Sequence, residues 1–126
     1  MAELEPTTYL GRVIEGTSKS FTFTIAHNGT GFQPEALFLS IWDKETGAVI
    51  LAETALTPIG TYVTGAGVAT IFLSTAHNAL VNTYLRKETE IHRVMARWTW
   101  TSSAGAEAGK AMFDIKVDPH VTEPGG

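Results

Sequence analysis

Apolar and polar residues alternate along several short segments of this chain. Phe21, Phe23 and Ile25 alternate with two threonines and an alanine. A period of two is typical of a strand with one buried face, so we expect a strand over residues 18–27. The other strands predicted before the C-terminal third cover residues 9–14, 36–42, 48–52, 61–64 and 68–73.

Turn-forming residues separate these strands. Glu15-Gly16 follows the first strand, and Asn28 to Gly31 follow the second with residues that tolerate a positive φ. Asp43 to Gly47 begins with Asp and ends with Gly, which predicts a type I turn whose last residue is left-handed. The loop Gly65 to Gly67 would join the last two of these strands as a hairpin.

One segment has the period of a helix. Its inward positions recur at spacings of four, three and four residues: Leu73, His77, Leu80 and Tyr84. Ser74 is placed as an N-cap. We expect one short helix that crosses between two sheets.

Two long strands with a small, glycine-rich loop at residues 102–109 follow. Apolar side chains alternate along both strands: Val94, Ala96, Trp98 and Trp100, then Ala111, Phe113, Ile115 and Val117. A register with Trp98 opposite Phe113 makes one continuous apolar face. The same register pairs Arg97 with Asp114 on the other face.

Seven or eight short strands and one crossover helix, without a βαβ rhythm, predict an all-β chain that forms an antiparallel β-sandwich. We expect an immunoglobulin-like sandwich rather than a small barrel. At 126 residues the chain is one domain. Residues 9–117 would form the sandwich, and residues 1–8 and 118–126, which contain prolines, would form extended arms.

Charge is scarce and unevenly distributed. Asp, Glu, Lys and Arg make up 17% of the chain, compared with roughly 25% in typical soluble domains. Neither residues 20–34 nor residues 54–85 contain one of them. Such a surface predicts that other protein covers it. The alternative is that threonine hydroxyls supply enough polarity, and the sequence leaves both open.

The composition argues against several classes of protein. There is no cysteine, so disulfides and thiolate chemistry are ruled out. A net charge of −4 provides no general attraction to nucleic acid or to an anionic membrane. No apolar run approaches the roughly 18 residues of a membrane span, and the acidic N-terminus does not predict a signal peptide. We therefore expect neither a nucleic-acid nor a membrane partner.

No motif predicts catalysis or a cofactor. The four histidines, which lie far apart, are His27, His77, His92 and His120. With no HExxH helix and no carboxylate at ligand spacing, they predict no metal site. The serines lack a GxSxG elbow. Glu88 and Glu90 alternate beside basic residues, which predicts a solvated patch of mixed charge. We expect a protein that is not an enzyme, with no catalytic, cofactor or metal residues.

Apolar side chains are also predicted on a face that should meet water. In the third predicted strand, Leu37, Leu39 and Ile41 form one face, and Phe38 and Trp42 form the other. If this strand lies beside the last hairpin, the outer face gathers side chains typical of interface cores. The predicted protein interface is Phe38, Trp42, Ile50, Met95 and Met112, with Leu4, Tyr9 and Val121 from near the chain ends. The opposite orientation, with Trp42 inward, stays open.

A loose order of elements spans residues 9–117. Its parts are Glu15-Gly16, Phe21 to Ile25, Asp43 to Gly47, Gly67 to Ser74 before a helix, Arg93 to Thr101, and Gly109 to Val117 with a Phe-Asp-Ile-Lys-Val ending. This order resembles the immunoglobulin-like domains of tailed-bacteriophage virion proteins, of the head-decoration or baseplate type. One departure is that residues 83–88 replace the usual Gly-Tyr before the long strand.

The resemblance implies a non-enzymatic structural protein of a phage particle. The leading expectation is a capsid decoration protein that binds the major capsid protein lattice and forms a homo-oligomer in the particle. Such a protein would be found in the virion, and in the cytoplasm of the bacterial host during assembly. The alternatives are a tail or baseplate component, and a surface-exposed adhesive or carbohydrate-binding module.

Overall fold

The computed structural model describes residues 7–81 and 89–119. Strands make up most of these residues, and the described part holds one helix, the four-residue α1 (Ile59–Tyr62). The strands are β1 (Thr7–Ile14), β2 (Lys19–Thr24), β3 (Ala26–His27), β4 (Thr30–Gly31), β5 (Ala36–Asp43), β6 (Val49–Ala55), β7 (Val68–Leu73), β8 (Glu90–Ser102) and β9 (Gly105–Asp118). The prediction of an all-β chain is confirmed.

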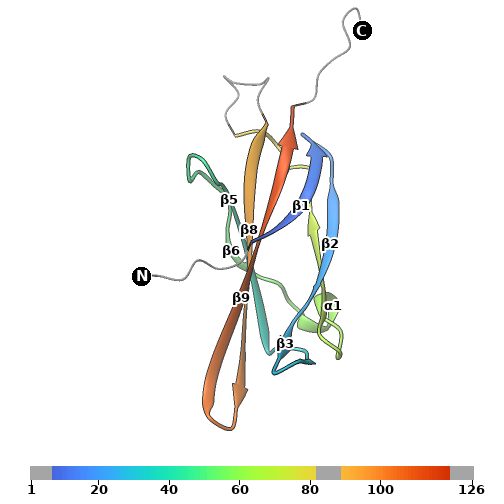
Figure 1. Ribbon diagram of the computed structural model, residues 1–126, viewed down its shortest axis with the longest axis vertical. Coiled ribbons are helices and arrows are strands. Elements are labelled where there is room, and N and C mark those ends of the chain that lie inside the picture. The colour runs from blue at the N-terminus through green and yellow to red at the C-terminus, as the bar shows by residue number, and fades with distance from the viewer. Residues whose placement is uncertain (1–6, 82–88, 120–126) are drawn as a thin grey trace, which may run out of the picture.

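The strands form two main sheets (Figure 1). Five strands, in the order β1-β9-β8-β5-β6, make the wide sheet, and β2 and β7 make the narrow sheet. β3 and β4 form a separate small hairpin. The long β8–β9 hairpin, orange to brown in Figure 1, extends beyond the other elements. The strand pairs are antiparallel except β1 with β9, which is parallel and departs from the expected antiparallel arrangement. Two strands joined by a tight turn must be antiparallel. β1 and β9 are the first and last of the described strands, so they are not joined in this way and can pair in parallel.

The two sheets pack face to face through their apolar sides. The ring centroid of Phe21 lies 4.9 Å from that of Phe113, and the ring of Phe23 lies 6.0 Å from that of Trp98. The buried apolar residues of β5, β8 and β9 are Leu37, Leu39, Ile41, Val94, Ala96, Trp98, Phe113, Ile115 and Val117. The third predicted strand, β5, therefore turns its leucine face inward. Burial of this shared apolar surface is the main force that holds the sheets together.

Three predicted turns contain the left-handed residue that they require. The φ angle is 76° at Gly16, 53° at Asn28 and 78° at Gly47. The Gly47 N–H donates to the Asp43 carbonyl over 2.8 Å, which closes the connection between β5 and β6. The turn chemistry read from the sequence is confirmed at these positions.

The predicted register of the last hairpin is wrong. Trp98 lies opposite Gly109 rather than Phe113, and the strands meet in a tight turn between Ser102 and Gly105. The indole fits there because Gly109 has no side chain: a Cβ atom at this position would lie 2.7 Å from the Trp98 ring. The error is an even number of residues, so each side chain keeps its predicted face.

The helix predicted from residue 73 is not formed in described residues 74–81, and the rest of it lies outside the described part. Ser74 does start a turn as an N-cap would, because its Oγ accepts from the His77 N–H over 3.3 Å. The buried Asn78 ends this turn, since its carbonyl accepts from the Gly16 N–H over 3.0 Å. An α-helix would need that carbonyl for the residue four positions later.

The predicted hairpin around Gly65 to Gly67 is formed only in part. The segment before the loop contains α1, and a single bridge joins Val63 to Ala69. The ladder does not continue back from Val63 because the preceding residues form α1, whose last turn is closed by a hydrogen bond from the Val63 N–H to the Ile59 carbonyl over 2.9 Å. β7 pairs with β2 instead.

The folded unit begins and ends slightly outside its predicted limits. β1 starts at Thr7 and β9 ends at Asp118. Residues 1–6 and 120–126 of the two predicted arms lie outside the described residues. No helix in the described part of the chain is long and apolar enough to cross a membrane.

Candidate functional site

The side of the wide sheet that points away from the core is a continuous surface, which we call the outer face. One row of neighbouring residues crosses all five strands on this face: Val49, Trp42, Arg93, Asp114 and Tyr9. The next row holds Ser40, Met95 and Met112. A third row holds Phe38, Arg97 and Lys110. Strands far apart in the sequence therefore place aromatic residues, methionines and arginines side by side.

Most of the predicted interface residues gather on this outer face. Four of them are half-buried there: Phe38, Trp42, Met95 and Met112. Tyr9 lies at the β1 edge with 55% of its surface exposed, and the Lys116 ammonium lies 5.8 Å from its ring centroid. The five residues form one surface rather than scattered exposed side chains.

The remaining predicted interface residues do not join this surface in the described structure. Ile50 packs against the buried core. Two register irregularities between β5 and β6 shift the alternation, so that Val49 lies opposite Trp42 and is 69% exposed. Leu4 and Val121 lie outside the described residues. Val49 is thus the apolar residue that the period-two pattern missed.

Charges on the outer face are paired within the sheet. The Arg93 Nε and Nη2 groups donate to the two carboxylate oxygens of Asp114 over 2.8 and 3.0 Å. The Lys44 ammonium lies 3.6 Å from the same carboxylate. Chiefly through the hydrogen bonds from Arg93, these cations lower the pKa of Asp114. The sequence-based pairing of Asp114 with Arg97 is wrong because the hairpin register differs.

Arg97 reaches the neighbouring strand β6 instead. Its Nε and Nη2 groups donate to the Glu53 carboxylate over 2.9 and 3.0 Å, which lowers the pKa of Glu53. The same guanidinium lies 4.4 Å from the ring centroid of Phe38, in cation–π geometry. An arginine paired in this way beside an aromatic ring can be covered by another protein without leaving a buried charge unpaired.

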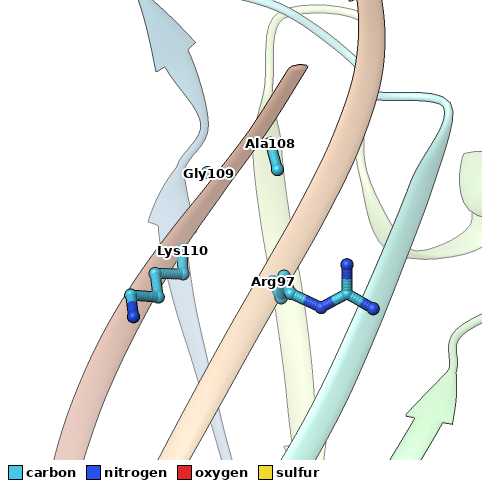
Figure 2. Close-up of a pocket in the computed structure, with 4 residues that line it drawn as sticks. All are labelled: Arg97, Ala108, Gly109 and Lys110. Carbon is cyan, nitrogen blue, oxygen red and sulfur yellow. The ribbon is translucent and has the colours of Figure 1, made fainter. Parts of the chain in front are cut away.

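Two shallow hollows border the outer face. One, of about 380 Å³, is lined by Arg97, Ala108, Gly109 and Lys110. Figure 2 shows that the Arg97 and Lys110 side chains point away from each other. The two cations therefore do not converge on a single anionic ligand. The other hollow, of about 350 Å³, is lined by Lys44, Glu45, Thr89 and Ile91.

The narrow sheet presents a second exposed surface, which we call the neutral face. Three cross-strand pairs form it: Ser20 with Phe72, Thr22 with Thr70, and Thr24 with Val68. Phe72 is 57% exposed and Val68 is 39% exposed. No residue of the neutral face is charged, because β2 and β7 fall almost entirely within the two uncharged stretches of the sequence. The residues predicted as an interface do not include this face, although its lack of charge is visible in the sequence.

A buried polar cluster lies on the inner side of the wide sheet, at one end of the core. It consists of Asp43, Glu90 and His92, whose potential ligand atoms lie within 4.8 Å of one another. The expectation that no carboxylate lies at ligand spacing from a histidine is therefore wrong. Glu90 and His92 are two residues apart on β8, so they share a face, and Asp43 lies directly opposite His92 on β5.

The members of this cluster are only partly hydrogen-bonded. His92 Nε2 lies 2.8 Å from Glu90 Oε1, and Asp43 Oδ2 accepts from the N–H and the hydroxyl of Thr46 over 2.9 and 2.7 Å. Within the described residues, Asp43 Oδ1 and His92 Nδ1 are buried without a partner. The Glu90 side chain is only 11% exposed. The predicted solvated patch is therefore wrong for Glu90, and Glu88 lies outside the described residues.

The other two described histidines, His77 and His27, lie in a turn and at a strand end. His77 Nδ1 accepts from the Ser74 N–H over 3.1 Å, and burial lowers the pKa of His77. His27 is exposed at the end of β3, with its ring centroid 5.5 Å from that of Trp100. Neither belongs to the buried polar cluster.

No protein-family model matches this sequence, and no curated protein matches it.

Proposed function

We propose that this chain is a non-enzymatic structural subunit of a tailed-phage particle, an immunoglobulin-like β-sandwich that decorates the capsid. In this proposal it binds the major capsid protein lattice through the outer face of the wide sheet. The sheet order β9-β8-β5-β6 supports the immunoglobulin-like part, because it matches the G-F-C-C′ order of variable-type domains. One departure is that the inward tryptophan, Trp98, is on β8, whereas Trp42 on β5 points outward.

The outer face is the observation that carries the proposal. Interface cores are enriched in aromatic residues, methionine and arginine, with few unpaired charges. This face combines all of these: an apolar centre around Trp42, Met95 and Met112, and arginines already paired with carboxylates. A protein partner can therefore cover the face without stranding a charge.

A capsid lattice supplies the partner that suits such a surface. The exposed apolar residues are few, and the flanking ion pairs remain partly accessible to water. A single contact of this kind is expected to be weak. Where many copies are held together on one particle, each dissociation is followed by rapid rebinding, so weak contacts give a stable coat.

The test uses particles of the phage that encodes this chain, assembled without it. Purified protein is added, and binding is measured by co-sedimentation. We expect Trp42→Glu to weaken binding about 30-fold or more, because it places a charge in the apolar centre of the face. The matched control, Phe72→Glu on the neutral face, should bind like the unmodified protein. Both variants should keep their melting temperatures.

Two results would count against the proposal. One is unmodified protein that stays in the supernatant with capsids, and binding to isolated tails would then favour the tail or baseplate alternative. The other is a folded Trp42→Glu variant that binds capsids normally. A glycan-array signal that the same substitution abolishes would favour the adhesive module.

A further inference from the structure

The buried polar cluster has the donor atoms of a cation site. Asp43 and His92 face each other across β5 and β8 and are 3% and 1% exposed, and Glu90 adjoins them on β8. We propose that this cluster binds a divalent transition-metal ion through His92 Nδ1 and Asp43 Oδ1, with Glu90 as the carboxylate that orients the imidazole. The site is on the inner side of the sheet and is independent of the docking role proposed for the outer face.

Glu90 fixes the form of the His92 ring. Its Oε1 lies 2.8 Å from His92 Nε2 and also accepts from the Val81 N–H over 2.8 Å. An ionised carboxylate can only accept hydrogen bonds, which assigns the imidazole proton to Nε2. The lone pair is then on Nδ1, which has no protein partner among the described residues. Metal-binding histidines commonly donate their other ring N–H to a carboxylate in this way.

Asp43 presents a matching open oxygen. Its Oδ2 accepts two hydrogen bonds from Thr46, which fix the carboxylate at the start of the turn between β5 and β6. Its Oδ1 is buried and has no partner within the described residues. Two buried acceptors without a donor are unfavourable. A cation bound by both atoms would satisfy each of them, and the cluster offers ligand atoms within 4.8 Å of one another.

The two proposed ligand atoms indicate which divalent cations the site would prefer. One imidazole nitrogen and one carboxylate oxygen suit Zn²⁺, Co²⁺ or Ni²⁺ better than Ca²⁺, which prefers oxygen ligands throughout. Because the two ligands are on different strands, the ion would link the β5–β6 turn to β8. Its expected role is therefore structural.

The test titrates Zn²⁺ into the full chain without an affinity tag, by calorimetry and thermal melting. We expect one Zn²⁺ per chain, and a melting temperature raised by about 10 °C when free Zn²⁺ is about 100 times the dissociation constant. Asp43→Asn and His92→Gln should each lose both effects. His27→Gln, which removes an exposed imidazole outside the cluster, should retain them.

A measurement on the unmodified protein keeps the proposal testable if the variants do not fold. In ¹⁵N spectra of the imidazole groups, Zn²⁺ should shift the Nδ1 signal of His92 and leave that of His27 unchanged. Three results would overturn the proposal: no stoichiometric Zn²⁺ binding, a Zn²⁺-dependent shift confined to other histidines, or full Zn²⁺ binding by a folded Asp43→Asn variant.

Discussion

The two exposed sheet faces differ in what they offer a partner. The outer face of the wide sheet combines Trp42, Met95 and Met112 with ion pairs that cross from strand to strand. The neutral face of the narrow sheet has three hydroxyl side chains on β2, with Phe72 and Val68 among its β7 residues, and no charge. Scarcity of charge and surplus of apolar side chains, which looked like one feature in the sequence, belong to different sheets.

This difference separates two explanations of the low charge. On the neutral face, threonine and serine hydroxyls supply the polarity, which is the alternative that the sequence left open. On the outer face, the charges are present but paired, and the apolar side chains between them carry the binding proposal. A low count of charged residues therefore does not by itself distinguish the proposed docking surface from the neutral face.

The largest expected effect concerns the core that the two sheets share. Phe113 contacts Phe21 and Phe23 across the layers, at 4.9 and 5.1 Å between ring centroids. Phe113→Ala should lower the free energy of unfolding by about 3–5 kcal/mol, because it leaves a cavity between the sheets. The adjacent Met112→Ala, on the outer face, should cost about 1 kcal/mol or less. Chemical denaturation measures both, and equal losses would show that the faces are assigned wrongly.

A smaller loss of stability is expected from a substitution that tests the register of the β8–β9 hairpin, in which Trp98 lies opposite Gly109. In Gly109→Ala, the added Cβ would lie 2.7 Å from the Trp98 ring. We expect a loss of about 1–3 kcal/mol from overpacking, measured by thermal melting. Gly65→Ala is the control, because no atom lies within 4 Å of the added Cβ and φ is not positive there. A Gly109→Ala variant as stable as this control would contradict the pairing of Trp98 with Gly109.

The smallest effect concerns the ion pairs, which distinguish the wide sheet from the narrow one. The pKa of Asp114 is lowered in the folded state, chiefly by Arg93. Asp114 therefore stabilises the fold at pH values above its unfolded pKa of about 3.9, and this stabilisation is lost as pH falls through the folded pKa. We expect Asp114→Asn to cost about 1 kcal/mol at pH 7, and the difference from the unmodified protein to disappear in acid.

Denaturation at a series of pH values measures that difference. Asp118→Asn is the comparison, since its partner Arg12 has a side chain that is 58% exposed and the pair should contribute less. A constant difference between the Asp114→Asn variant and the unmodified protein from pH 7 to pH 2 would show that the effect is not electrostatic.

Local rules predicted the strands and the left-handed turns, because alternation and turn chemistry act within a few residues. They could not choose between the two apolar faces of β5, since only its neighbours determine which side meets the core. The hairpin register depended on Gly109 receiving the Trp98 ring, and the alternation is the same in either register. The predicted helix failed because Asn78 bonds to Gly16, a contact distant in the sequence.

The candidate sites show the same limit. Phe38, Trp42, Met95 and Met112 were placed on one outer face because their strands alternate regularly. The irregular β5–β6 pairing put Val49 on that face in place of Ile50. The buried polar cluster was missed because Asp43 meets His92 only through strand pairing. The spacing of Glu90 and His92 on one strand face was the signal that could have revealed part of it.

The most direct test of the proposed docking role of the outer face is hydroxyl-radical footprinting of the protein, free and bound to particles assembled without it. The measurement reports both faces at once, because Trp42, Met95 and Met112 lie on the outer face and Phe72 on the neutral face. We predict that binding protects these three outer-face side chains from oxidation and leaves Phe72 as reactive as in the free protein. Protection of Phe72 with unchanged oxidation of Trp42, Met95 and Met112 would contradict the account.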